Sequence, residues 1–96
     1  MASYSITNRA EADLKRILIF GYERFGERQG DRYAEELEEV FQRLAHHPRM
    51  GRPASNFGPN VRRHEHEAHV ILYEETEEGV SILAVVHAAG MHSARL

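Results

Sequence analysis

Histidine is the residue type in this chain with the most chemistry to offer. Seven histidines are present, and His64, His66 and His69 lie close together. His64 and His66 would share one face of a strand, but a zinc site usually needs three or four ligands. His69 is offset from them by an odd number of residues and would point to the other face unless a turn intervened. Glu65 and Glu67 interleave with these histidines, which is typical of a solvated strand edge, so we predict neither a metal site nor a cofactor.

His87 ends the last strand that the sequence predicts, and it is the best candidate for proton transfer. Imidazoles titrate near neutral pH, which suits a general acid. One reaction that uses such an acid is metal-free RNA cleavage. That reaction also needs a base for the 2′-hydroxyl and cations for the developing phosphorane charge. Arg62 and Arg63 could supply that charge, but no complete acid–base set accompanies them. We therefore predict no catalytic residue and favour a structural or partner-contacting role for His87.

The positive charge is concentrated in one stretch of an acidic chain. The net charge is −3, and Lys15 is the only basic residue that is not an arginine. No acidic residue falls between Glu39 and Glu65, whereas five arginines do: Arg43, Arg49, Arg52, Arg62 and Arg63. A domain that holds nucleic acid by itself is usually basic overall. The charge distribution favours a protein partner, or a small anionic target surface, over free DNA or RNA.

Five residues are our candidates for contacts with a target or a partner: Arg52, Arg62, Arg63, Tyr73 and His87. A local positive field from the arginines would steer an anionic partner towards this part of the chain. Arg52 and Arg62 have an equally good structural explanation, because either side chain could pin the neighbouring loop. We assign no catalytic, cofactor-binding or metal-ligating role to any of the five.

The composition predicts one domain without disulfides. A chain of 96 residues buries roughly two thirds of its unfolded surface, enough for one core. There is no cysteine, so thiol catalysis and thiolate metal sites are excluded. The N-terminal residues lack a basic run followed by an apolar segment, and no apolar run is long enough to cross a bilayer. We therefore expect a single domain, residues 1–96, in the cytoplasm.

Two amphipathic helices are predicted in the first half of the chain. Residues 4–6 form a short predicted strand, and Asn8 follows as a helix N-cap with Glu11 at the capping-box spacing. The first helix covers residues 9–25 and ends at Gly26. Its apolar stripe, which we expect to be core, consists of Leu14, Ile17, Leu18, Gly21, Tyr22 and Phe25.

Two details of the helices allow two interpretations each. Ile19 and Phe20 lie partly off the stripe, so we expect one of them to pack against Tyr4 or to reach a partner. The second helix begins at residue 27 or only after Gly30, since glycine weakens a helix interior by about 1 kcal/mol relative to alanine. It ends before Pro48, and the short link makes the two helices antiparallel neighbours.

Three further strands are predicted at residues 61–65, 69–74 and 80–87, after a loop at residues 50–60. Residues 69–73 are apolar at nearly every position, which is typical of a strand covered on both faces. The helices would cover one face. We expect an added strand or a groove-bound helix of a partner to cover the other.

The order and spacing of several short motifs carry a family resemblance. The motifs are Ala12-Asp13-Leu14, Tyr22, Gly26, Leu44-Ala45, Pro48-x-x-Gly51-Arg52, Val61-Arg62 and Val86-His87. In this order they resemble the ParE branch of the RelE/ParE superfamily of bacterial toxins. The resemblance implies an α+β fold, in which an N-terminal strand and an antiparallel helical hairpin pack on a small, mainly antiparallel β-sheet.

The resemblance also implies a function. Such a chain would be the toxin component of a type II toxin–antitoxin system of the kind that stabilises plasmids. A ParD-like antitoxin would neutralise it by forming a hetero-oligomer with it. ParE-type toxins poison DNA gyrase by binding rather than by chemistry, so we expect no enzymatic activity. The chain would meet operator DNA only through the antitoxin, and no membrane is implied.

Two alternatives remain open at this point. One is a ribosome-dependent mRNA endonuclease of the RelE type, and the other is an inactive module that binds the antitoxin and helps repress the operon. RelE-type nucleases resemble this scaffold and draw on lysines, arginines and a C-terminal tyrosine. This chain has no lysine after Lys15 and no tyrosine after Tyr73, so we favour the ParE-like interpretation.

Overall fold

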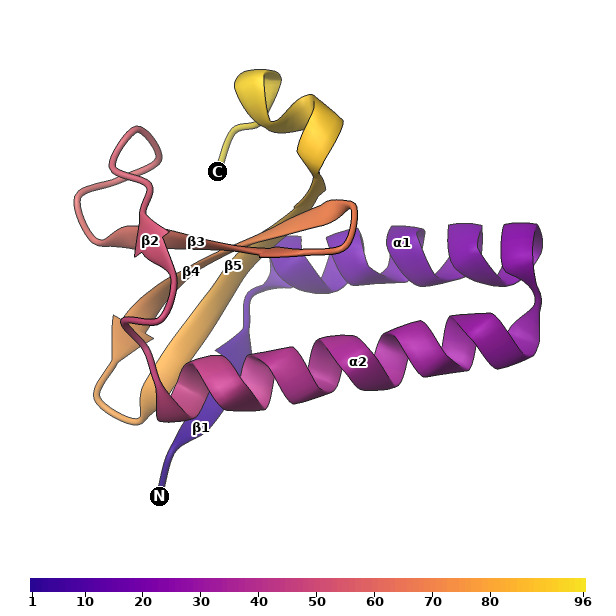
Figure 1. Ribbon diagram of the computed structural model, residues 1–96. Coiled ribbons are helices and arrows are strands. Elements are labelled where there is room, and N and C mark those ends of the chain that lie inside the picture. Colours follow the sequence, from indigo (N-terminus) through magenta and orange to yellow (C-terminus); the bar gives the residue numbers. More distant parts are fainter.

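The computed structural model describes all 96 residues and arranges them as a helical layer on a mixed β-sheet (Figure 1). The elements are β1 (Ser3–Ile6), α1 (Asn8–Phe25), α2 (Glu27–His46), β2 (Arg52–Pro53), β3 (Val61–His66), β4 (His69–Thr76), β5 (Gly79–His87) and the 3₁₀ helix η1 (Ala88–Ser93). The strand order is β1-β5-β4-β3-β2, and only the β1–β5 pair is parallel. The predicted α+β class and mainly antiparallel sheet are therefore confirmed.

The helix boundaries differ from the prediction at two points. Thr7, not Asn8, caps α1, because its hydroxyl accepts a hydrogen bond from the Ala10 amide at 3.1 Å. The second helix includes Gly30, which is buried against the ring of Tyr22, where a Cβ would clash. The close helix–helix contact that glycine permits at this position explains why α2 tolerates it. Neither helix has the length and apolarity that a transmembrane span requires.

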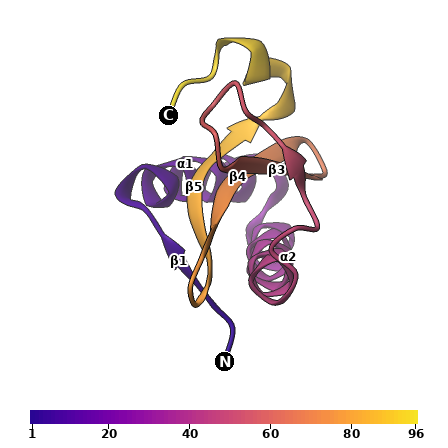
Figure 2. The same ribbon diagram turned by 90° about the vertical axis from the view of Figure 1, so that its left-hand side faces the viewer.

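Both faces of the central strands are covered, as predicted, but the second cover is not a partner. On one face, Ile71 and Tyr73 of β4 pack in the main core with α2 residues such as Leu44. On the other face, Val70 and Leu72 belong to a smaller core that the chain itself encloses. The loop before β3 and the yellow segment η1 lie over that face, opposite the helices (Figures 1 and 2). The expectation that this face awaits a partner was wrong.

A buried carboxylate fastens α1 to the sheet. Asp13 is 2% exposed, and its Oδ2 accepts a hydrogen bond from the Val85 amide of β5 at 3.0 Å. Arg9 donates to the same carboxylate at 3.1 Å, and Arg16 also donates to it. A buried charge is costly unless it is paired and hydrogen-bonded, and these partners meet both conditions. The Ala12-Asp13-Leu14 motif is therefore a helix-to-strand anchor.

The helical hairpin projects beyond the sheet, so its two halves have different surroundings (Figure 1). The buried residues of α1 are Ala10 and Asp13, both near its start. Tyr22 and Phe25 are 37% and 55% exposed, although their positions in the helical stripe predicted core residues. That prediction was wrong for these two, because the sheet does not extend far enough to cover them.

Candidate functional site

The predicted arginine stretch forms an ion-paired edge on the sheet face that lies away from the helices. Strand pairing places Arg52 of β2 opposite Arg63 of β3. Glu65 accepts a hydrogen bond from the Arg52 guanidinium at 2.7 Å and from the Arg63 Nε at 3.1 Å. Partial burial would raise the pKa of Glu65, but the two arginines outweigh it and keep that pKa below its usual value. The trio retains one positive charge in excess.

Arg62 and Tyr73 lie on the opposite face, where they fasten the loop after α2. The Arg62 Nη1 donates to the Gly51 carbonyl oxygen at 2.6 Å. The Tyr73 hydroxyl donates to the Pro48 carbonyl oxygen and accepts from the Gly51 amide, both at 2.8 Å. A Cβ on residue 51 would lie 2.6 Å from the Arg63 carbonyl oxygen, so only glycine fits there. This geometry explains the Pro48-x-x-Gly51 motif and assigns Arg62 to the loop.

Tyr73 is fully buried, which places it in the core instead of on a contact surface. The arginines between Glu39 and Glu65 have acidic neighbours in the fold, although their stretch of sequence has none. Arg49 lies 3.5 Å from a Glu75 carboxylate oxygen, so strand residues supply acids that the stretch itself lacks. Of the five predicted contact residues, Arg52 and Arg63 lie together at the edge where both contact Glu65, and the exposed His87 lies apart from them at the end of β5.

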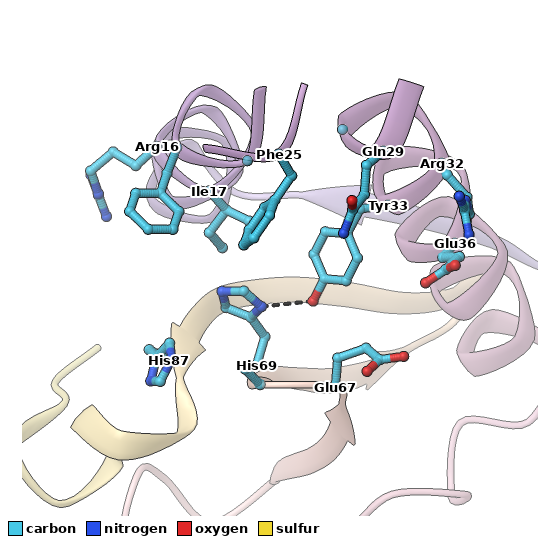
Figure 3. Close-up of a pocket in the computed structure, with 14 residues that line it drawn as sticks. Arg16, Ile17, Phe25, Gln29, Arg32, Tyr33, Glu36, Glu67, His69 and His87 are labelled. Carbon is cyan, nitrogen blue, oxygen red and sulfur yellow. Dashed lines mark hydrogen bonds between the residues drawn. The ribbon is translucent and has the colours of Figure 1, made fainter. Parts of the chain in front are cut away.

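A pocket of about 800 Å³ opens between the projecting half of the helical hairpin and the turn that joins β3 to β4 (Figure 3). Ile17, Phe20 and Phe25 supply its apolar wall, and Phe20 is 58% exposed. The rim carries charges of both signs, with Arg16 on α1 and Glu67 at the turn among them. An apolar wall of this size open to solvent is typical of an interaction site.

A tyrosine–histidine pair forms the polar floor of the pocket (Figure 3). The Tyr33 hydroxyl lies 2.7 Å from the His69 Nδ1. Burial, followed by the nearby His87 and His66, lowers the pKa of His69. Burial, followed by the Glu67 and Glu36 carboxylates, raises the pKa of Tyr33 to about 12. Near neutral pH the tyrosine is therefore the donor and the neutral imidazole the acceptor.

His64, His66 and His69 lie on one face of the sheet. Register pairs His64 with Ile71 and His66 with His69, so all three histidines share the face that carries the helices. The turn at residues 67–68 reverses the chain and cancels the odd offset. His64 faces α2, where burial and then the charge of Arg43 lower its pKa. The sequence placed His69 on the other face unless a turn intervened, and the structure has that turn.

His87 lies at the edge of the pocket and helps to end β5. Its ring centroid is 5.7 Å from that of His69, and its Nδ1 accepts a hydrogen bond from the Ala89 amide at 3.1 Å. The imidazole thus caps η1, which is a structural role, while the partner-contacting role that the sequence also allowed stays a prediction. The sequence of residues 90–96 shows no periodicity, so η1 was not predicted.

The sequence did not reveal the pocket as a unit, although it offered one signal. Phe20 was set apart as an off-stripe residue able to reach a partner, and it lies on the pocket wall. The alternative, packing against Tyr4, is not observed, because the Tyr4 ring packs on Phe41 at a centroid distance of 5.4 Å. His69 and Tyr33 could not be linked from sequence, since they come from different elements.

The sequence matches one family profile and is similar to curated relatives that carry the same toxin name. The sequence profile described as "ParE toxin of type II toxin-antitoxin system, parDE" matches residues 4–91. Toxin ParE1 of Caulobacter vibrioides is 36% identical over 87 residues, which cover 91% of this chain and 90% of the relative. Toxin ParE1 of Mycobacterium tuberculosis is 32% identical over 85 residues, which cover 88% and 87%.

One solved structure shares the fold. A chain from the chromosomal ParDE TA system of P. aeruginosa superposes with a TM-score of 0.75 and 20% sequence identity. The superposition covers 91% of this chain and 96% of that chain. At this level of identity the likeness concerns the arrangement of the helices and the sheet.

Proposed function

This chain belongs to the ParE toxin family of type II toxin–antitoxin systems, and we propose on that basis that it poisons DNA gyrase by binding and is neutralised by a ParD-like antitoxin. In this proposal the toxin performs no chemistry of its own. The antitoxin occupies the pocket beside the projecting half of the helical hairpin, and the two proteins form a hetero-oligomer.

The observation that carries the proposal is the apolar wall of the pocket. Phe20 and Phe25 are 58% and 55% exposed, and the chain has no segment of its own over them. A segment of the antitoxin with apolar residues at helical spacing would bury these rings, as helices do in hydrophobic grooves. Arg16 and Glu67 on the rim would pair with charges at the sides of such a helix. Aromatic anchors of this kind usually dominate binding energy.

A matched pair of variants tests the antitoxin site. Phe20→Ser removes a pocket wall residue, whereas Ile19→Ser removes a neighbouring side chain of nearly equal exposure, 57% against 58%, that does not line the pocket. We expect Phe20→Ser to weaken antitoxin binding by about ten- to a hundredfold, measured by titration calorimetry against the antitoxin encoded beside this gene. Ile19→Ser should bind within a few-fold of the wild type. Equal losses for both variants would place the antitoxin elsewhere.

The gyrase target rests on the family and on the residual charge of the β2–β3 edge. Arg52 and Arg63 share a single acid, so the edge remains attractive to an anionic surface such as gyrase-bound DNA. Purified toxin added to gyrase and supercoiled plasmid should accumulate a cleaved-DNA complex, and antitoxin should reverse it. Ribosome-positioned cuts in mRNA, lost in His87→Ala, would instead establish the endonuclease alternative. Binding of antitoxin without either effect would identify an inactive co-repressor.

A further inference from the structure

Three side chains with metal-ligating atoms converge where α2 meets the turn between β3 and β4. They are Glu36 on α2, His66 at the end of β3 and Glu67 in the turn, and one ligand atom of each lies within 4.8 Å of the other two. The His66 Nε2 is 3.3 Å from the Glu36 Oε1. Tetrahedral zinc with bonds of about 2.0–2.1 Å holds neighbouring ligand atoms about 3.3–3.5 Å apart. Two of the three atoms therefore already have the spacing of a zinc site.

Neither carboxylate has an arginine or lysine within 4.0 Å. The ion pairs of the chain include Glu36 only with His66, and they do not include Glu67 at all. Both carboxylates lie on the same side of the pocket, beside Tyr33 (Figure 3). A divalent cation would offset this concentration of negative charge.

The fold restrains two of the three ligands before any ion binds. The His66 ring packs 5.6 Å from the Tyr33 ring, centroid to centroid, and its side chain is 19% exposed. Glu36 is held on a regular helix turn, so its backbone is fixed. Glu67 is exposed, and one of its carboxylate oxygens lies within 4.8 Å of the other two ligand atoms. Restrained ligands of this kind lose little freedom when a metal binds.

We propose that Glu36, His66 and Glu67 form a binding site for a divalent transition-metal ion of the Zn²⁺ class. One imidazole nitrogen and two carboxylate oxygens suit Zn²⁺, Co²⁺ or Ni²⁺, whereas Mg²⁺ and Ca²⁺ prefer oxygen ligands alone. Three protein ligands leave a fourth position for water or for a side chain of a bound protein. The ion would link α2 to the β3–β4 turn at the rim of the pocket. This inference does not depend on the gyrase or antitoxin proposals.

Zinc titration of the full, untagged chain tests the site. We expect one saturable Zn²⁺ per chain by calorimetry and a rise in melting temperature with added Zn²⁺, while Mg²⁺ at the same concentrations produces neither. His66→Gln and Glu67→Gln should each weaken Zn²⁺ binding at least about tenfold. His47→Gln is the matched control, because His47 is an exposed histidine outside the cluster, and its affinity for Zn²⁺ should stay at the wild-type value.

Several outcomes would overturn the proposal. Absence of saturable Zn²⁺ binding to the folded wild type is one. Unchanged binding in both His66→Gln and Glu67→Gln is another, and a loss confined to His47→Gln would assign the metal to the His46-His47 pair. Glu67→Gln alters only an exposed turn residue, so it keeps the test valid if His66→Gln fails to fold, as circular dichroism would reveal.

Discussion

The two halves of the helical hairpin use similar residues and reach opposite results. Near the sheet, Leu37 and Leu44 of α2 are at most 2% exposed and pack on β4 and β5. Beyond the sheet edge, Phe20 and Phe25 of α1 are more than half exposed and line an open pocket. Helical periodicity tells which side chains share a face, but not how far the covering sheet extends. One half therefore stabilises the fold, and the other leaves exposed aromatic rings at the site where we propose that a partner binds.

The largest contrast is expected between Leu44→Ala and Phe20→Ala. Leu44 is fully buried, so its truncation should leave a cavity and lower the free energy of unfolding by about 2–5 kcal/mol. Phe20→Ala removes a ring that is already 58% exposed, and its cost should stay within about 0.5 kcal/mol. Urea unfolding of the free toxin measures both values. Similar losses for the two variants would show that the projecting half is packed after all.

Asp13→Ala should be the next most damaging change, and it acts in the half of α1 that meets the sheet. The variant leaves the buried Val85 amide without an acceptor and frees Arg9 and Arg16, so we expect a loss of about 1.5–3 kcal/mol. Asp13→Asn retains an oxygen for the Val85 amide and should cost less. If both variants unfold at the wild-type urea concentration, the carboxylate is not the anchor that we describe.

Tyr73→Phe should lower the free energy of unfolding by less than Asp13→Ala, and it acts at the loop that follows α2. It deletes one hydroxyl that serves both the Gly51 amide and the Pro48 carbonyl, and the Gly51 amide is left unsatisfied in a buried position. We expect a loss of about 1–2 kcal/mol and faster amide exchange at Gly51. Tyr22→Phe, which removes an exposed hydroxyl bonded to Asp31 at 2.9 Å, is the control and should change little. A neutral Tyr73→Phe would contradict the role of this hydroxyl in holding the loop.

The sequence predicted more of the fold than of the site, for physical reasons. Turn residues and apolar periodicity depend on neighbours along the chain, so both helices and strands β3 to β5 could be placed. The β2 strand could not, because Arg52–Pro53 is ordered by pairing with β3 rather than by its own pattern. The pocket floor joins Tyr33 to His69 across elements, and such long-range contacts leave no spacing signal.

The arginine candidates illustrate the same limit. Sequence left structural and functional roles open for Arg52 and Arg62, and geometry separates them. Arg62 donates to the Gly51 carbonyl oxygen and belongs to the loop, whereas Arg52 pairs with Glu65 at an exposed edge. Alternation along β3 puts Arg62 and Arg63 on opposite faces, and the register that pairs Arg52 with Arg63 puts Arg52 on the Arg63 face. The sequence did not predict the β2 strand, so this register could not be inferred.

Arg63→Ala concerns a surface that belongs to neither half of the hairpin, and only a small change in stability is expected there. Its guanidinium lies 3.0 Å from a Glu65 oxygen that Arg52 also contacts, and surface pairs of this kind contribute little. We expect the free energy of unfolding to fall by no more than about 0.5 kcal/mol.

Growth arrest and gyrase-dependent DNA cleavage should nevertheless weaken in Arg63→Ala, because the edge loses the positive charge it has in excess and attracts an anionic surface less strongly. The effect should diminish as salt is raised, since salt screens charges at an exposed edge. Arg28→Ala, an exposed arginine on α2 that lies away from the β2–β3 edge, supplies the control for a simple loss of net charge. If Arg63→Ala stays fully toxic while Arg28→Ala does not, the target meets the hairpin instead of the sheet edge. Antitoxin affinity, measured on the same protein, distinguishes the two surfaces, because the pocket proposal predicts that it is unchanged in Arg63→Ala.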